Sequence, residues 1–135
     1  MRRRHFIRYA AGTTAIAVTA AGWPASCVAP ASPQLKDGEI MHTVLFELKH
    51  PAGSAEAEKF LTDGRRILTA VPGVRNFQAC RQCSPKNEYP YGFLMTFAGQ
   101  ADFEAYTAHP DHGKFVKERW ETEVTRFLES DFVKI

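Results

Sequence analysis

The 135-residue sequence has little of several features that define large classes of protein. Three cysteines are too few for a small fold held together by disulfides. No run of about 20 strongly apolar residues occurs, which excludes a protein with several membrane-spanning helices. It contains no phosphate-binding glycine loop, serine nucleophile elbow or haem-attachment motif. The remaining composition, 44% apolar and 24% charged, is that of one ordinary globular domain.

The chain also lacks a basic stripe, although its formal net charge is +2. The positive excess lies entirely within residues 1–31, which contain four arginines and no acid. Removing those four from the 17 basic residues leaves 13 in the rest of the chain, against 15 acidic residues. A slightly acidic domain of this kind does not have the electrostatic footprint of a nucleic-acid-binding protein.

Residues 1–31 have the pattern of an export signal. A basic start is followed by a mildly apolar stretch over 9–21 and then by small residues and prolines. The run Arg3-Arg4-His5-Phe6-Ile7-Arg8 resembles the twin-arginine export signal of bacteria. An ordinary secretory signal with extra arginines is the alternative. Either interpretation predicts a periplasmic or secreted bacterial protein.

Two processing sites are compatible with this segment. Ala29-Pro30-Ala31 fits a small-x-small cleavage site, which would leave a mature chain starting at Ser32. Alternatively, Cys27 could carry a lipid and attach the protein to a membrane. We favour simple cleavage, because Pro24 stands where a lipidation site normally has leucine.

The hydrophobic pattern of the mature chain predicts alternating strands and helices after a flexible lead-in over 32–40. Ser54 is the expected N-cap of the first helix, and Pro72-Gly73 is expected to end it. The predicted elements are a strand 41–48, a helix 55–71, an extended segment 74–83, a loop 84–90, a strand 91–97, helices 101–108 and 111–128, and a strand 130–135. This β-α-β-β-α-β order predicts an α+β, ferredoxin-like protomer.

Such a sheet has helices on one face only. Its other face would expose Leu45 and apolar groups of the third and fourth strands. A patch of that kind on a small domain usually marks an interface, so we expect a homodimer in which two sheets stack.

Several motifs now coincide: His42 in the first strand, Val71-Pro72-Gly73-Val74 after the first helix, and Tyr106-Thr107-Ala108-His109-Pro110-Asp111-His112. Together they resemble the stress-responsive A/B barrel domain family of the dimeric α-β barrel superfamily, over residues 41–135. The resemblance implies a ferredoxin-like protomer whose sheet packs against a second copy.

The resemblance also implies site residues. A plant member of the family closes a linear polyketide by aldol condensation, and His42, Tyr106 and His112 match three of its pocket residues. Two further positions differ from the pocket of that enzyme. Tyr91 stands roughly where the enzyme has a histidine, and Gly64 roughly where it has a tyrosine.

These residues predict a ligand pocket between sheet and helices, lined by His42, Tyr91, Tyr106, His109 and His112. We expect it to bind a small hydrophobic or carbonyl-bearing molecule. A cofactor-free lyase or cyclase is an alternative, since imidazole and phenol suffice for proton transfer and enolate stabilisation, with His42, Tyr106 and His112 as catalytic residues. A non-catalytic structural stress dimer is the third reading.

Metal and redox chemistry have weaker signals. His42, His109 and His112 could hold Zn²⁺ or Cu²⁺ together with Asp111 or Glu104. Pro110 disturbs the spacing, so we expect neither metal nor cofactor. Cys80 and Cys83 form a C-x-x-C motif. On an extended strand they would lie too far apart for a disulfide, so a bridge between them would require a turn or bulge there.

Overall fold

The computed structural model describes residues 34–135. The predicted export signal (1–31), with its cleavage site and Cys27, lies outside these residues. In the expected lead-in, Glu39 N–H donates to the Lys36 carbonyl at 3.1 Å and closes a turn. Ile40 already belongs to the first strand. None of the helices within 34–135 is both long and apolar enough to cross a membrane.

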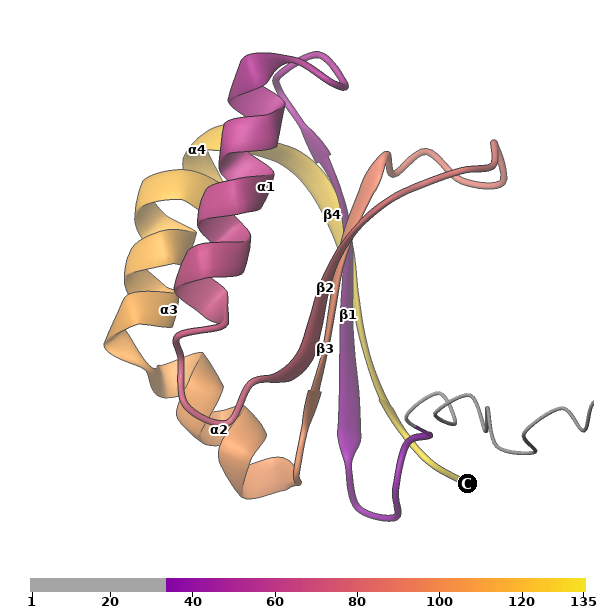
Figure 1. Ribbon diagram of the computed structural model, residues 1–135, viewed down its shortest axis with the longest axis vertical. Coiled ribbons are helices and arrows are strands. Elements are labelled where there is room, and N and C mark those ends of the chain that lie inside the picture. Colours follow the sequence, from indigo (N-terminus) through magenta and orange to yellow (C-terminus); the bar gives the residue numbers. More distant parts are fainter. Residues whose placement is uncertain (1–33) are drawn as a thin grey trace, which may run out of the picture. The chain divides into compact units, whose positions relative to one another are not determined.

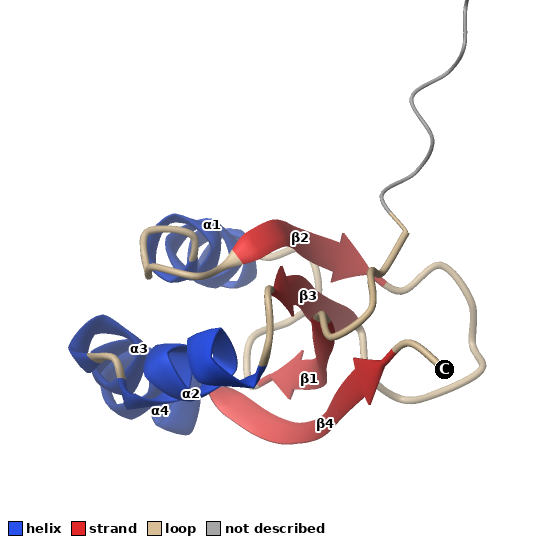
Figure 2. Cartoon of the chain, turned by 90° about the horizontal axis from the view of Figure 1, so that it is seen from below, coloured by secondary structure: helices blue, strands red, loops and turns tan. Residues whose placement is uncertain are grey.

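The described chain is an antiparallel sheet with all of its helices on one face (Figures 1 and 2). The strand order β2-β3-β1-β4 is that of the ferredoxin-like arrangement, so the predicted fold class is confirmed. The elements are β1 (Ile40–Leu48), α1 (Ala55–Leu68), β2 (Arg75–Arg81), β3 (Tyr91–Phe97), α2 (Gln100–Ala108), α3 (Pro110–Phe115), the π-helix η1 (Val116–Trp120), α4 (Glu121–Glu123) and β4 (Val124–Val133).

The capping residues predicted from the sequence are found at the helix ends. The Ser54 hydroxyl accepts a hydrogen bond from the Ala57 N–H at 3.2 Å and caps α1. His109 ends α2 and starts α3, with Pro110 in the first helical position. The first helix ends at Leu68 rather than at residue 71, but Val71 remains buried against the core.

The prediction of a helix over 111–128 and a strand over 130–135 is wrong at their junction. Helical structure ends at Glu123, and β4 begins at Val124. Phe127 and Leu128 continue the apolar spacing of the helix in sequence, but they pair with Phe46 and Leu45 of β1. Pairing with a strand some 80 positions earlier in the chain overrides the local helical pattern here.

The core lies between the sheet and the helices and is largely aromatic. Along β1 burial alternates, and the inward side chains are Ile40, His42, Val44, Phe46 and Leu48. Phe46 packs against Phe93 of β3 and Trp120 of η1, with ring centroids 4.8 and 5.0 Å apart. Gly64 lets α1 approach this cluster, because a Cβ there would lie 2.8 Å from the Phe93 ring.

The other face of the sheet has no helix on it. Leu45 and Leu94 are only partly buried there, and Leu128 and Phe132 are 50% and 51% exposed. We call these four side chains the open face. Cys80 lies on the same side of β2, and neither it nor Cys83 is in a disulfide.

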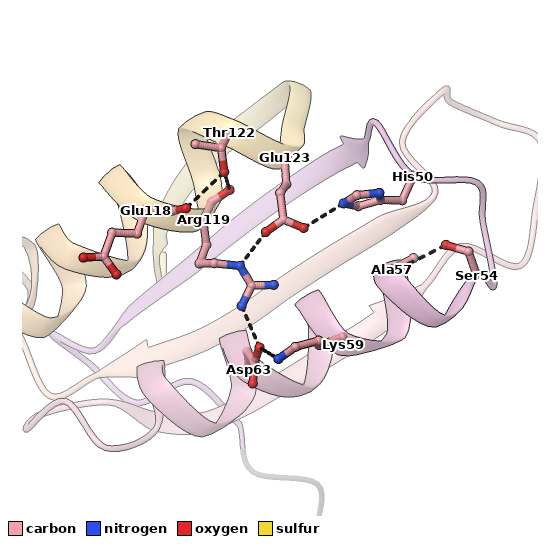
Figure 3. Close-up of polar contacts among 9 residues, drawn as sticks. All are labelled: His50, Ser54, Ala57, Lys59, Asp63, Glu118, Arg119, Thr122 and Glu123. Carbon is pink, nitrogen blue, oxygen red and sulfur yellow. Dashed lines mark hydrogen bonds and ion pairs between the residues drawn. The ribbon is translucent and has the colours of Figure 1, made fainter.

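A chain of ion pairs fastens the second helical segment to α1 (Figure 3). The Arg119 guanidinium contacts Glu123 and donates to Asp63 Oδ2 at 2.6 Å. Glu123 also contacts His50, with 2.8 Å between Oε2 and Nε2. Hydrogen bonds from Lys59 and Arg119 lower the pKa of Asp63 from 3.8 to about 2. The ionised Asp63 carboxylate therefore stabilises the folded state.

This network predicts an acid-dependent contribution to stability. Because its pKa is lowered on folding, Asp63 contributes fully above its unfolded pKa, and the contribution is lost as pH falls from about 4 to 2. We expect Asp63→Asn to lower the free energy of unfolding at pH 7 by about 1 kcal/mol, allowing for solvent screening. The stability of the Asp63→Asn variant should also fall less steeply than that of the parent between pH 4 and 2. Denaturant unfolding across this range measures both effects.

Glu118→Gln is the matched control, because it removes an exposed carboxylate that makes no ion pair within residues 34–135. An equal loss of stability in both variants, or an unchanged acid slope in Asp63→Asn, would contradict the assigned role.

Candidate functional site

A cavity of about 400 Å³ lies between the sheet and the second helical segment. Its wall combines side chains of α1, α2, α3, η1 and α4 with those of β1, β3 and β4. Most of the lining is apolar or aromatic, and the polar contributions are few, as is usual for small-molecule sites. The lining residues are His42, Val44, Leu68, Phe93, Met95, Phe103, Tyr106, Thr107, His112, Phe115, Val116, Trp120, Glu121, Phe127 and Glu129.

His42 reaches the cavity from the inward face of β1. It is 5% exposed, and its ring lies near Phe103 and Tyr106, at centroid distances of 5.5 and 6.1 Å. Asp131 stands opposite it on β4, and the distance from Nδ1 to Oδ1 is 2.6 Å. A carboxylate can only accept, so Nδ1 of the neutral ring carries the proton and Nε2 the lone pair.

Tyr106 reaches the cavity from α2 and is 3% exposed. Burial, with a smaller contribution from the negative charge of Glu129, raises the pKa of its phenol well above the ordinary value of 10.0. The hydroxyl therefore stays protonated at neutral pH. Within residues 34–135 it makes no hydrogen bond to protein, and because no fully buried side-chain oxygen there lacks a partner, the hydroxyl must be accessible. It is thus a donor available to a molecule in the cavity.

His112 lies beside Tyr106, with ring centroids 4.3 Å apart. It belongs to α3, and its Nδ1 contacts the carbonyl of Thr107 at 3.2 Å. A carbonyl accepts, so Nδ1 of the neutral ring is the donor and Nε2 is left as an acceptor. Burial lowers the pKa of His112 below 6.5, which keeps the imidazole neutral at pH 7.

The three side chains together offer complementary chemistry. Tyr106 supplies an O–H donor, and the neutral His112 ring supplies a lone pair on Nε2. The His42 ring lies beside them with its Nδ1 engaged by Asp131. The lining contains no lysine or arginine, and its charged members are Glu121 and Glu129. This combination suits a polar group such as a carbonyl on an apolar molecule, and gives no counter-charge to an anion.

Two of the residues named from the sequence are placed elsewhere. Tyr91 packs against Phe46, and its hydroxyl accepts a hydrogen bond from the Gly53 N–H at 3.1 Å. The His109 ring accepts one from the Asp111 N–H at 3.2 Å and caps α3. Neither side chain lines the cavity.

Sequence reasoning missed Glu129 and Asp131, whose carboxylates face His42. The predicted helix to 128 left Glu129 outside the strand, and Asp131 lay in the predicted strand but without a predicted pairing partner. The available signal was the weak strand preference of Val124, Thr125 and Phe127. The histidine sets considered for a metal are not brought together either, because His109 instead contacts its neighbour Asp111.

Comparison with known proteins agrees with the fold. The sequence profile of the Stress responsive A/B Barrel Domain matches residues 40–134. The chain belongs to this family. No curated protein matches it in sequence.

Three solved structures illustrate the likeness. A dabb family protein with a ferredoxin-like fold from Mesorhizobium loti is 49% identical, with a TM-score of 0.71, covering 73% of this chain and 99% of that one. A dimeric ferredoxin-like protein of unknown function from Thermobifida fusca is 18% identical, with a TM-score of 0.63 and coverages of 76% and 97%. The hydroxynitrile lyase of Passiflora edulis is 14% identical, with a TM-score of 0.65 and coverages of 74% and 96%.

The cavity makes a prediction about His112. Because burial disfavours its charged form, its NMR titration midpoint should lie below 6.5 in the folded protein. The same residue in the urea-unfolded chain, an internal reference, should titrate near 6.5. Protonation then costs folding free energy as pH falls below 6.5. A folded-state midpoint at or above the unfolded one would show that the ring is not held in an apolar cavity.

Proposed function

We propose that the cavity binds a small hydrophobic molecule that bears a carbonyl group. The observation that carries this proposal is the protonated Tyr106 hydroxyl, which has no protein partner in the described chain and stays accessible on a residue that lines an apolar cavity. A ligand carbonyl would accept from this hydroxyl, and the aromatic lining would cover the rest of the molecule. The volume, about 400 Å³, is of the size used for small ligands.

Ligand retention tests the proposal. The full chain is incubated with a metabolite mixture, separated by gel filtration, and the retained compounds are identified by mass spectrometry. We expect apolar carbonyl compounds, whose affinity for Tyr106→Phe should drop about tenfold, the value of one buried hydrogen bond. Tyr91→Phe is the matched control, because it removes a buried hydroxyl outside the cavity and should leave affinity unchanged.

If no compound is retained, and 2-naphthaldehyde binds no better than 2-methylnaphthalene by NMR, the binding proposal is wrong. A structural stress dimer would then describe the protein better.

Catalysis without a cofactor is the second candidate. It is supported by the imidazoles of His42 and His112 near the Tyr106 phenol, and by the likeness to a hydroxynitrile lyase. A neutral imidazole could take a proton from carbon next to the carbonyl, while the phenol stabilises the developing oxyanion. His112→Ala and His42→Ala should then abolish turnover of a retained ligand without unfolding the protein. Unchanged turnover in both variants would exclude this role.

We further propose that the protein acts as a homodimer formed through the open face. Related solved structures are described as dimeric, and the exposed leucines and phenylalanine of this face need a partner. Two copies stacked sheet to sheet would bury them.

Sedimentation tests the dimer. Leu128→Glu places a charge in the centre of the proposed interface, so dimer affinity should fall by roughly 100-fold while the fold is retained. Lys117→Glu, an exposed charge change on η1, should leave the dimer intact. A monomeric parent chain, or a Leu128→Glu variant that still dimerises, would disprove the interface.

We also propose that residues 1–31 direct export by the twin-arginine route and that a mature chain starts at Ser32. The supporting observation is the confinement of the positive charge excess to this segment. Cys27 remains the alternative processing point, at which a lipid would attach the protein to a membrane.

A further inference from the structure

One side-chain cluster is not used by the ligand-binding proposal. Glu129 and Asp131 occupy alternate positions of β4, so both point to the helix-covered side, toward His42. Nδ1 of His42 lies 2.6 Å from Asp131 Oδ1 and 3.8 Å from Glu129 Oε1. One ligand atom from each residue lies within 4.8 Å of the other two.

The charge balance of this cluster distinguishes it from the other ion pairs of the described chain. Elsewhere, neighbouring carboxylates share a strong base: Asp63 and Glu123 share Arg119, and Glu47 and Glu88 share Arg126. Within residues 34–135, Glu129 and Asp131 contact no lysine or arginine, and their only ionisable partner is His42. Two adjacent carboxylates without a cation repel each other, and a bound cation would relieve that repulsion.

The donor set favours a particular class of cation. One imidazole nitrogen and two carboxylate oxygens form a mixed set, suited to divalent first-row transition ions that accept both nitrogen and oxygen. The histidine is fixed on a central strand and buried. The carboxylates are 49% and 40% exposed in their side chains, so they can adjust to metal–ligand distances and leave coordination positions open.

We propose that His42, Glu129 and Asp131 form a binding site for a divalent transition ion of the Mn²⁺ or Fe²⁺ type. The ion would take the place of the Nδ1 proton, which moves to Nε2, so the ring changes from acceptor to donor on its other nitrogen. Glu129 also lines the cavity, which places the ion at the cavity wall. The site departs from the expectation of no metal drawn from the sequence.

Metal binding by the full chain tests this site. Mn²⁺ is the probe, because it prefers oxygen and nitrogen ligands and the cysteine thiols will compete little for it. After removal of metal with a chelator, we expect one bound Mn²⁺ per chain, detected by the loss of the free-ion EPR signal. Glu129→Gln and Asp131→Asn, which keep side-chain shape, should each weaken binding at least tenfold.

Glu118→Gln is the control, since it removes one exposed carboxylate outside the cluster and should bind as the parent does. A second readout is the melting temperature, which Mn²⁺ should raise in the parent and in Glu118→Gln but not in the two cluster variants. Absence of stoichiometric binding, or equal binding by all variants, would overturn the site. Neither result bears on retention of an apolar carbonyl compound, so this proposal and the ligand proposal fail separately.

Discussion

The register between β1 and β4 is the constraint on which the site depends. It sets Asp131 opposite His42 and Phe127 opposite Phe46, so a carboxylate faces the His42 ring and an aromatic side chain faces the cavity. Side chains alternate along a strand, and a slip of one residue would turn all of them to the open face. The register shift between Glu47 and Leu48 at the end of β1, opposite the start of β4, helps to fix this register. The chemistry of His42 is thus decided by a pairing at the edge of the sheet.

The helical layer supplies the opposite wall, and two features position it. The Arg119 network fastens α4 and η1 to α1, and the loop after β1 joins it through His50. The π-helical turn places Val116 and Trp120 on the cavity while Arg119 faces this network. Gly64 allows the close approach of α1 to the Phe93 ring. The aromatic cluster around Phe46 and Phe93 is therefore tightly packed, and the cavity lies next to it between the sheet and the second helical segment.

Much of the fold could be predicted because its signals are local. Alternating side-chain patterns mark β1 and β3. Ser54 caps the start of α1, and His109-Pro110 separates α2 from α3. The end of that segment was not predictable in the same way. Phe127 and Leu128 fit the helical spacing, and only the presence of β1 beside them selects the strand.

The residues of the candidate site also differ in whether local sequence signals identify them. His42, Tyr106 and His112 were singled out by motif, and the structure places all three on one cavity. Glu129 and Asp131 have no motif of their own, because their relation to His42 exists only after two distant strands pair. Tyr91 and His109 were predicted to line the pocket from their residue type and position. In the structure both accept hydrogen bonds from backbone N–H groups outside the cavity.

The one-sided covering of the sheet has a consequence for any assembly of two copies. Each cavity lies on the helix side, so stacking through the open face would put the two cavities on opposite outer sides of the pair. Two sheet layers, about 10 Å apart, would separate them. Neither cavity could contact the occupant of the other. The two sites should therefore bind ligand independently, with a Hill coefficient of one. Dimerisation would then affect stability and solubility rather than the dependence of binding on ligand concentration.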